Sequence, residues 1–178
     1  GGRVIGVDLN PAMGVKAQTH GAAPGRRVEC REGPMANTIP GLGERILVGS
    51  GAVGTVLRRG LDLPVELVEL LNLRRPEAVL ALHRAYREAG SRVVLTNTFA
   101  ANPLRLDEIG AADQCRAINE AGVALARRAA GGDALVWASV GPLSLGFRHE
   151  DFPFDQLEAL FGAQCAALAG ADAIVLET

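Results

Sequence analysis

The sequence predicts an α/β fold built around a parallel sheet. Four short apolar runs begin near residues 46, 92, 134 and 173, and helical patterns separate them. Strands that are apolar along their whole length are covered on both faces, as in parallel sheets. The runs end in polar residues or glycine, at the strand ends where α/β folds bind their ligands. The pattern therefore favours the repeating βα unit of a barrel or a doubly wound sheet.

The first apolar run, residues 46–48, leads into the glycine-rich segment GSGAVGT at residues 49–55. This segment fits the GxGxxG pattern of dinucleotide-binding folds. Two observations weigh against that interpretation. The following helix would be cut short at Gly60, and the second strand ends without the acidic residue that binds a ribose. A glycine-rich turn that lets the backbone approach a ligand is the simpler interpretation.

The remaining elements follow from apolar periodicity and from proline and glycine at the helix ends. Pro76 suits a first helical turn and Gly90 stops that helix, whose predicted buried face comprises Ala78, Leu82, Ala85, Tyr86 and Ala89. The predicted elements are a helix over 76–89, a strand over 92–95, a short helix over 103–108, a helix over 112–130, a strand over 134–140, a helix over 155–170 and a strand over 173–176.

Three features that could carry chemistry have simpler structural interpretations. His83 has no partner four residues away in its helix, so we interpret it as a packed or solvated residue rather than a metal ligand. Cys115 is interpreted as a small buried hydrophobic residue. Residues 148–151, RHED, lie in a long loop and are interpreted as solvated surface, with a lid as the alternative.

The composition excludes several classes of function. The chain has 178 residues, a formal net charge of −2 and only 4% aromatic residues. These values predict neither attraction to nucleic acid or an acidic membrane surface nor a base-stacking platform. No apolar run approaches the ~20 residues that a membrane helix needs. Three cysteines without a CxxC motif are too few for a disulfide framework, so a reduced, cytoplasmic setting is expected.

The N-terminal part of the chain differs from the rest. Residues 1–34 are rich in glycine and proline and have no sustained hydrophobic period. We expect residues 1–45 to be a flexible extension and residues 46–178 to form the folded domain. Met35 is a candidate natural start, and a genuine flexible arm is the alternative. A (βα)8 barrel takes roughly 250 residues, so the chain from Met35 supplies about half of one.

Polar residues and glycine gather at the ends of all four predicted strands. The candidate substrate-binding residues are Ser50, Gly51, Thr96, Asn97, Thr98, Ser139 and Glu177. In a βα barrel these positions face the same mouth, so they predict a ligand site. Glu177 follows an apolar strand, where a carboxylate is costly to bury unless it meets a cation. That cation is either a ligand ammonium group or an internal arginine, Arg92 or Arg148.

Six collinear motifs over residues 46–178 resemble those of the homocysteine S-methyltransferase family. The motifs are GSGAVGT (49–55), ELLNLRRPE (69–77), HRAYREAGSRVVLTNTFAAN (83–102), INEAGVALAR (118–127), ASVGPLS (138–144) and ADAIVLET (171–178). The resemblance implies a (βα)8 TIM barrel, truncated here to about its first four βα units. It also implies methyl transfer to homocysteine to give methionine. Glu177 and an acid at the first motif would hold the substrate amino group, and residues 96–98 would line the pocket.

The resemblance also implies Zn²⁺, held by three cysteine thiolates, that binds the sulfur of homocysteine. A free thiol is mostly protonated at neutral pH, whereas a zinc-bound one is a thiolate. The family places these cysteines in later strands, and none of Cys30, Cys115 and Cys165 matches a ligand position, so the chain alone is expected to be inactive. The methyl donor stays open among methyltetrahydrofolate by way of cobalamin, betaine, S-methylmethionine and S-adenosylmethionine.

The first motif departs from the usual DGAMGT of the family, because Ser50 stands at the acidic position. Serine lacks a charge and is expected to weaken ammonium binding by about 1–3 kcal/mol, unless a neighbour such as Glu44 compensates. Two other interpretations stay open. The chain could be half of a different TIM-barrel enzyme, or a non-catalytic half-barrel that serves as a binding module.

Overall fold

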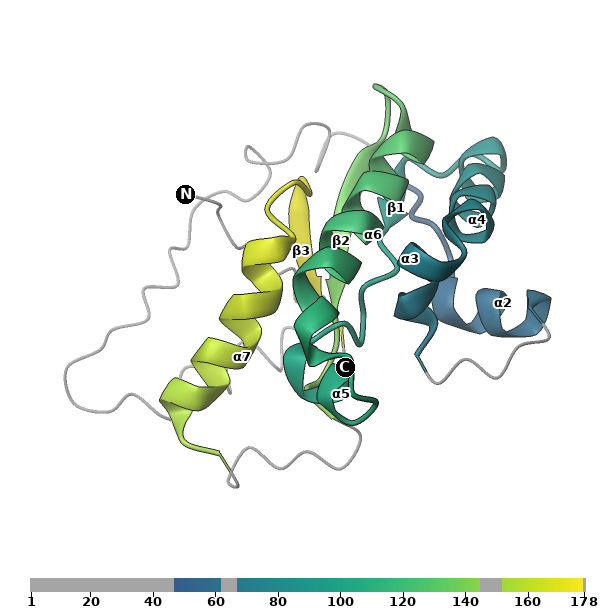
Figure 1. Ribbon diagram of the computed structural model, residues 1–178. Helices are drawn as coiled ribbons and strands as arrows, with labels where there is room; N and C mark the ends of the chain where they lie inside the picture. The colour runs from purple at the N-terminus through teal and green to yellow at the C-terminus, as the bar shows by residue number, and fades with distance from the viewer. Residues whose placement is uncertain (1–46, 62–66, 145–151, 178) are drawn as a thin grey trace, which may run out of the picture.

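The computed structural model describes residues 47–61, 67–144 and 152–177, which place a layer of helices against a small sheet (Figure 1). The helices are α2 (Val53–Gly60), α3 (Leu71–Arg74), α4 (Pro76–Glu88), α5 (Pro103–Asp107), α6 (Cys115–Ala130) and α7 (Phe154–Ala167), with 3-10 turns η2 (Val68–Leu70) and η3 (Ala112–Gln114). The strands are β1 (Val93–Leu95), β2 (Leu135–Val140) and β3 (Ala173–Leu176). This alternation confirms the predicted α/β class.

The three strands run parallel in the order β1-β2-β3. Val94 lies opposite Val136, and Ala138 lies opposite Ile174. Because the strands are parallel, their carboxyl ends share one edge of the sheet. The sheet does not close on itself within the described residues. The structure therefore contains an open, three-stranded sheet rather than the closed barrel.

The predicted first strand, residues 46–48, is wrong as a regular strand in the part that the structure describes. Leu47 and Val48 lie outside any strand, and Gly49 alone forms an isolated parallel bridge, to Val93. Backbone hydrogen bonds still hold the segment beside β1, because Arg92 N–H donates to Val48 O at 2.7 Å. Val48 is 56% exposed, so packing does not hold this run in a regular ladder.

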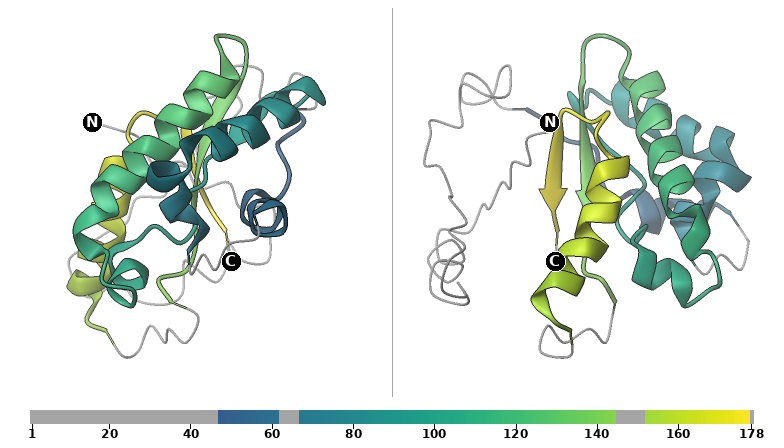
Figure 2. Two further views of the ribbon diagram at one scale, coloured as in Figure 1. Left: turned by 45° about the vertical axis from the view of Figure 1, so that its right-hand side comes forward. Right: turned by 60° about the vertical axis from the view of Figure 1, so that its left-hand side comes forward.

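Helices α4, α6 and α7 lie on the same face of the sheet (Figure 2). Between α6, α7 and the strands is a buried layer of mostly small and β-branched side chains, comprising Val94, Val136, Ala138, Ile174, Val123, Ala126, Ala130 and Leu168. Small residues on α6 let the helix approach the sheet closely, and the excluded water stabilises the layer. This packing fixes the carboxyl ends of the strands relative to one another.

The buried face of α4 differs from the predicted one. The face predicted from Ala78 to Ala89 is half-buried or exposed, and the buried residues are Val79, Leu80 and His83. Val79 and Leu80 belong to an apolar cluster with residues of α2, α3 and α6. Because α4 packs against several helices at once, its neighbours define its buried face more than its apolar period does. His83 is fully buried and is therefore a packed residue, not a solvated one.

Several predictions concern residues outside the described ranges. They are the flexible extension over 1–45, the natural start at Met35, the solvated loop or lid at 148–151, and any compensation of Ser50 by Glu44. Among the helices that the structure does describe, none combines the length and the apolar character needed to cross a membrane.

Candidate functional site

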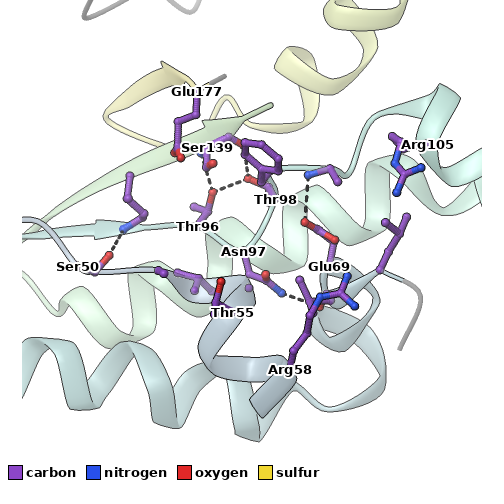
Figure 3. Close-up of a pocket in the computed structure, with 18 of the residues that line it drawn as sticks. Ser50, Thr55, Arg58, Glu69, Thr96, Asn97, Thr98, Arg105, Ser139 and Glu177 are labelled. Atoms are coloured by element: carbon purple, nitrogen blue, oxygen red, sulfur yellow. Dashed lines mark hydrogen bonds between the residues drawn. The ribbon is translucent and has the colours of Figure 1, made fainter. Parts of the chain in front are cut away.

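A cavity of about 610 Å³ lies at the carboxyl ends of the strands (Figure 3). Its walls come from the glycine-rich turn, from η2, from the segment that follows β1, and from the ends of β2 and β3. It is lined by all seven predicted substrate-binding residues, namely Ser50, Gly51, Thr96, Asn97, Thr98, Ser139 and Glu177. Residues 127 positions apart in the sequence therefore meet at one site, because parallel strands share their carboxyl edge.

The hydroxyl groups of Thr96 and Thr98 cross-link the ends of β1 and β2. Thr98 Oγ1 donates to Ser139 O at 2.8 Å, and Ser139 N–H donates to Thr96 Oγ1 at 3.1 Å. The two threonine oxygens lie 2.5 Å apart, so Thr96 supplies the proton between them. Both hydroxyl protons are thus used within the protein, and these side chains can offer a ligand only their lone pairs.

The side-chain amide group of Asn97 is also used in hydrogen bonds within the protein. Its Nδ2 group donates to Val68 O at 2.8 Å and to Asn72 Oδ1 at 3.0 Å. Asn72, on α3, returns a hydrogen bond from its Nδ2 to Asn97 O at 2.8 Å. Asn72 was not among the predicted site residues, although a polar residue within the apolar run of residues 67–73 is a signal that sequence reasoning could have used.

The backbone after β1 turns its carbonyl groups toward the helices. Asn97 O accepts from Asn72, and Thr98 O accepts from Gln164 Nε2 at 2.8 Å. No described peptide bond is cis, and in a trans peptide the N–H points opposite to the C=O. The N–H groups of Thr98 and Phe99 therefore point away from α3 and α7. Neither N–H group has a hydrogen-bond acceptor among the described residues. Both residues line the cavity, so these N–H groups can bind an anion there.

Ser50 lies on the opposite wall of the cavity and is 8% exposed. Its Oγ accepts the N–H of Leu95 at 2.9 Å, which ties the glycine-rich turn to the end of β1. Gly51 follows, and a Cβ there would lie 3.0 Å from the hydroxyl oxygen of Tyr86. A side chain at this position would therefore crowd the Tyr86 ring, which would have to shift by a few tenths of an ångström.

Glu177 is held in place by its backbone, since its N–H donates to Val140 O at 2.9 Å. Its Oε1 atom is buried and has no hydrogen-bond partner in the described part of the chain. Arg92, one of the two internal cations considered for it, instead pairs with Asp133 at the opposite edge of the sheet, at 2.9 Å. Arg148 lies outside the described residues.

A second buried carboxyl group, Glu69 of η2, was missed by the sequence analysis. Glu69 is 3% exposed and lines the cavity. Its Oε1 accepts the N–H of Ala100 at 3.0 Å, and its Oε2 has no hydrogen-bond partner among the described residues. Burial raises the pKa of Glu69, against the opposing effects of the Ala100 N–H and of the positive charges on Arg58 and Arg105. A charged residue inside an apolar patch was the available signal.

Residues 47–178 match the Homocysteine S-methyltransferase family. The chain belongs to this family. Methionine synthase from Mycobacterium tuberculosis is 36% identical over 157 residues, a match that covers 77% of this chain and 13% of that protein. Methionine synthase from Mycobacterium leprae is 39% identical over 98 residues, covering 50% of this chain and 8% of that protein.

Solved structures of the homocysteine methyltransferase MmuM from Escherichia coli share the fold. The metallated form superimposes with a TM-score of 0.64 at 28% identity, covering 74% of this chain and 53% of that chain. The oxidised form gives a TM-score of 0.62, also at 28% identity, and covers 72% of this chain and 51% of that chain. The chain described here thus spans about half the length of MmuM and a small part of the methionine synthases.

The described residues do not fit the zinc that the family implies. Within the three described ranges, no group of three His, Cys, Asp or Glu side chains is placed to hold a metal ion. Cys115 is buried in α6, where its Sγ donates to Ala101 O at 3.3 Å, and burial raises the pKa of its thiol. Burial also raises the pKa of the Cys165 thiol. At both positions burial disfavours the thiolate form that zinc requires.

Proposed function

We propose that the cavity binds the amino-acid head group of homocysteine, and that the chain is the substrate-binding part of a homocysteine S-methyltransferase. The observation that carries the proposal is the buried, unpartnered Oε1 of Glu177 in a cavity formed by the motifs of that family. A buried carboxylate oxygen without a partner is unfavourable, and a ligand ammonium group would satisfy it.

The same cavity offers a place for the other charge of an amino acid. The free N–H groups of Thr98 and Phe99 would receive the substrate carboxylate, as successive backbone N–H groups do in anion sites. Glu177 would receive the ammonium group, and Ser50 and Ser139 would offer hydroxyl groups between them. An α-amino acid matches this pairing of an acceptor with donors, because it carries both charges on one carbon.

Sulfur activation is not assigned to the described residues, because they supply no thiolate ligands. The proposed reaction for the whole enzyme is transfer of a methyl group to the homocysteine sulfur, giving methionine. Methyltetrahydrofolate by way of cobalamin, betaine, S-methylmethionine and S-adenosylmethionine all stay open as donors, because no donor group is identified in the cavity.

Calorimetric titration of the chain with L-homocysteine under reducing conditions tests the proposal. Glu177→Gln should weaken binding about tenfold or more, since a hydrogen bond to a charged group contributes roughly 1.5–3 kcal/mol. Glu88→Gln is the matched control, because Glu88 is exposed at the end of α4 and does not line the cavity. Absence of binding by the unmodified chain refutes the proposal.

An analogue sharpens the assignment of Glu177. 4-Mercaptobutyrate keeps the thiol and the carboxylate of homocysteine and lacks its amino group. If Glu177 holds the ammonium group, the analogue should bind the unmodified chain and the Glu177→Gln variant equally well. An equal loss for both ligands would instead mean that the substitution disturbs the cavity as a whole.

A further inference from the structure

Three amide side chains from three helices hold the backbone segment that follows β1. Asn72 of α3 donates to Asn97 O at 2.8 Å, Gln164 of α7 donates to Thr98 O at 2.8 Å, and Asn119 of α6 donates to Ala101 O at 2.7 Å. We call Asn72, Asn119 and Gln164 the amide clamp. All three are 0–2% exposed, and they lie behind the segment rather than among the residues that line the cavity.

We propose that Gln164 is a positioning residue for the substrate carboxylate, through its hold on the carbonyl group of Thr98. The proposal rests on the proposed function of the cavity. Gln164 fixes one end of the Thr98–Phe99 peptide plane, and the N–H of Phe99 lies at the other end of the same plane. A hydrogen bond from α7 therefore sets the direction of an N–H group that faces the ligand.

The stability of the fold alone does not account for a glutamine at this position. Gln164 is fully buried, and its Oε1 has no hydrogen-bond partner within the described residues. A buried acceptor without a partner costs about 1–3 kcal/mol, so an apolar side chain of similar size would be tolerated at least as well. Thr98 O also accepts the N–H of Ala101 at 3.1 Å, so removing the glutamine does not leave that carbonyl without a donor.

The members of the amide clamp make further contacts besides those to the segment after β1. Gln164 Nε2 also lies 3.5 Å from Asn119 Oδ1, so two members of the clamp touch. Asn119 bonds its own helix as well, at Cys115 O, which fixes its rotamer. The amide groups of Gln164 and Asn119 thus lie side by side, and each also holds a carbonyl group of the segment after β1.

The decisive variant is Gln164→Met, which keeps the length of the side chain and removes its hydrogen-bonding groups. Gln156→Met is the matched control, because Gln156 is exposed on the same helix. Two quantities are measured, the affinity for L-homocysteine and the positions of the backbone amide resonances of Thr98 and Phe99. Gln164→Met should weaken binding about fivefold and shift both resonances, with a melting temperature equal to or above that of the unmodified chain. Gln156→Met should change neither quantity.

Unchanged affinity in a folded Gln164→Met variant overturns the proposal. If the unmodified chain itself fails to bind homocysteine, the proposed function fails and this inference fails with it. If the unmodified chain binds and Gln164→Met leaves the Thr98 and Phe99 resonances unchanged, only the inference is refuted. If Gln164→Met does not fold, Gln164→Leu also removes the donor to Thr98 O and is judged by the same affinity criterion. A merely structural role would lower stability and leave the affinity of the folded fraction unchanged.

Discussion

His83 makes the stability of this domain sensitive to mild acid. The imidazole is 0% exposed in α4, and neither ring nitrogen has a hydrogen-bond partner in the described residues. Burial lowers the pKa of His83 from 6.5 to about 4. The folded chain therefore keeps this side chain neutral at a pH where the unfolded chain protonates it.

The size of the effect follows from the two pKa values. The folded pKa is depressed, so the contribution of His83 is present above pH 6.5 and is lost as the pH falls toward 4. Between pH 7 and pH 5 this one group should lower the free energy of unfolding by about 2 kcal/mol, and by about 3 kcal/mol at pH 4. Small domains are stable by only about 5–15 kcal/mol, so the loss is readily measured.

Urea unfolding of the unmodified chain and of His83→Leu, each at pH 7 and pH 5, tests this reasoning. Leucine removes the titrating group and two unpaired nitrogens, so the variant should be about as stable as the unmodified chain at pH 7. It should be about 2 kcal/mol more stable at pH 5. Arg84→His, which adds an exposed histidine one position away, should leave the pH dependence unchanged. Equal pH dependence in His83→Leu and the unmodified chain would refute the assignment.

Four other substitutions have effects that the structure predicts. A Cβ at Gly122 would lie 2.7 Å from side-chain atoms, so Gly122→Ala should lower the unfolding free energy by about 1–3 kcal/mol in urea. Gly162→Ala meets nothing within 4 Å and should raise it by about 0.5–1 kcal/mol; equal effects would contradict the packing argument. Burial raises the pKa of Asp172, yet hydrogen bonds from Arg127 and a backbone N–H lower it overall, so Asp172→Asn should destabilise by about 1 kcal/mol at pH 7. That difference should shrink below pH 4, as the carboxyl protonates; a pH-independent difference would argue against it. Ser50→Asp should tighten homocysteine binding about tenfold in calorimetry, and weaker binding would mean that the added charge repels other groups of the cavity.

The sequence predicted most of the elements because their signals are local. Proline at the first turn, glycine after the last, and apolar runs of strand length locate α4, β2 and β3 to within a few residues of their observed bounds. The first strand was predicted wrongly because a regular ladder depends on what packs around it. Val48 is exposed, and the apolar run of residues 46–48 says nothing about such neighbours.

All seven residues predicted for the site line the cavity, but Glu69, which also lines it, was missed. Residues at strand ends are identifiable from sequence, because the carboxyl edge of a parallel sheet is a fixed place in the fold. Glu69 and Asn72 were missed because a polar residue in an apolar run can be either buried or solvated. Only its hydrogen-bond partner, which the sequence does not identify, decides between the two. Gln164 was visible as a polar residue between apolar positions on α7, yet its partner, Thr98 O, is 66 residues away.

Two groups of ion pairs lie at the amino-terminal edge of the sheet, away from the cavity. Asp133 pairs there with Arg87 and Arg92, and Arg127 pairs with Asp172. These ion pairs are partly exposed and screened by salt, whereas the hydrogen bonds around the cavity are mostly buried and uncharged. Stability and ligand binding can therefore be changed at separate ends of the sheet. Substitutions at the amino-terminal edge can adjust thermal tolerance and salt response, while the ligand preference is redesigned at the other end.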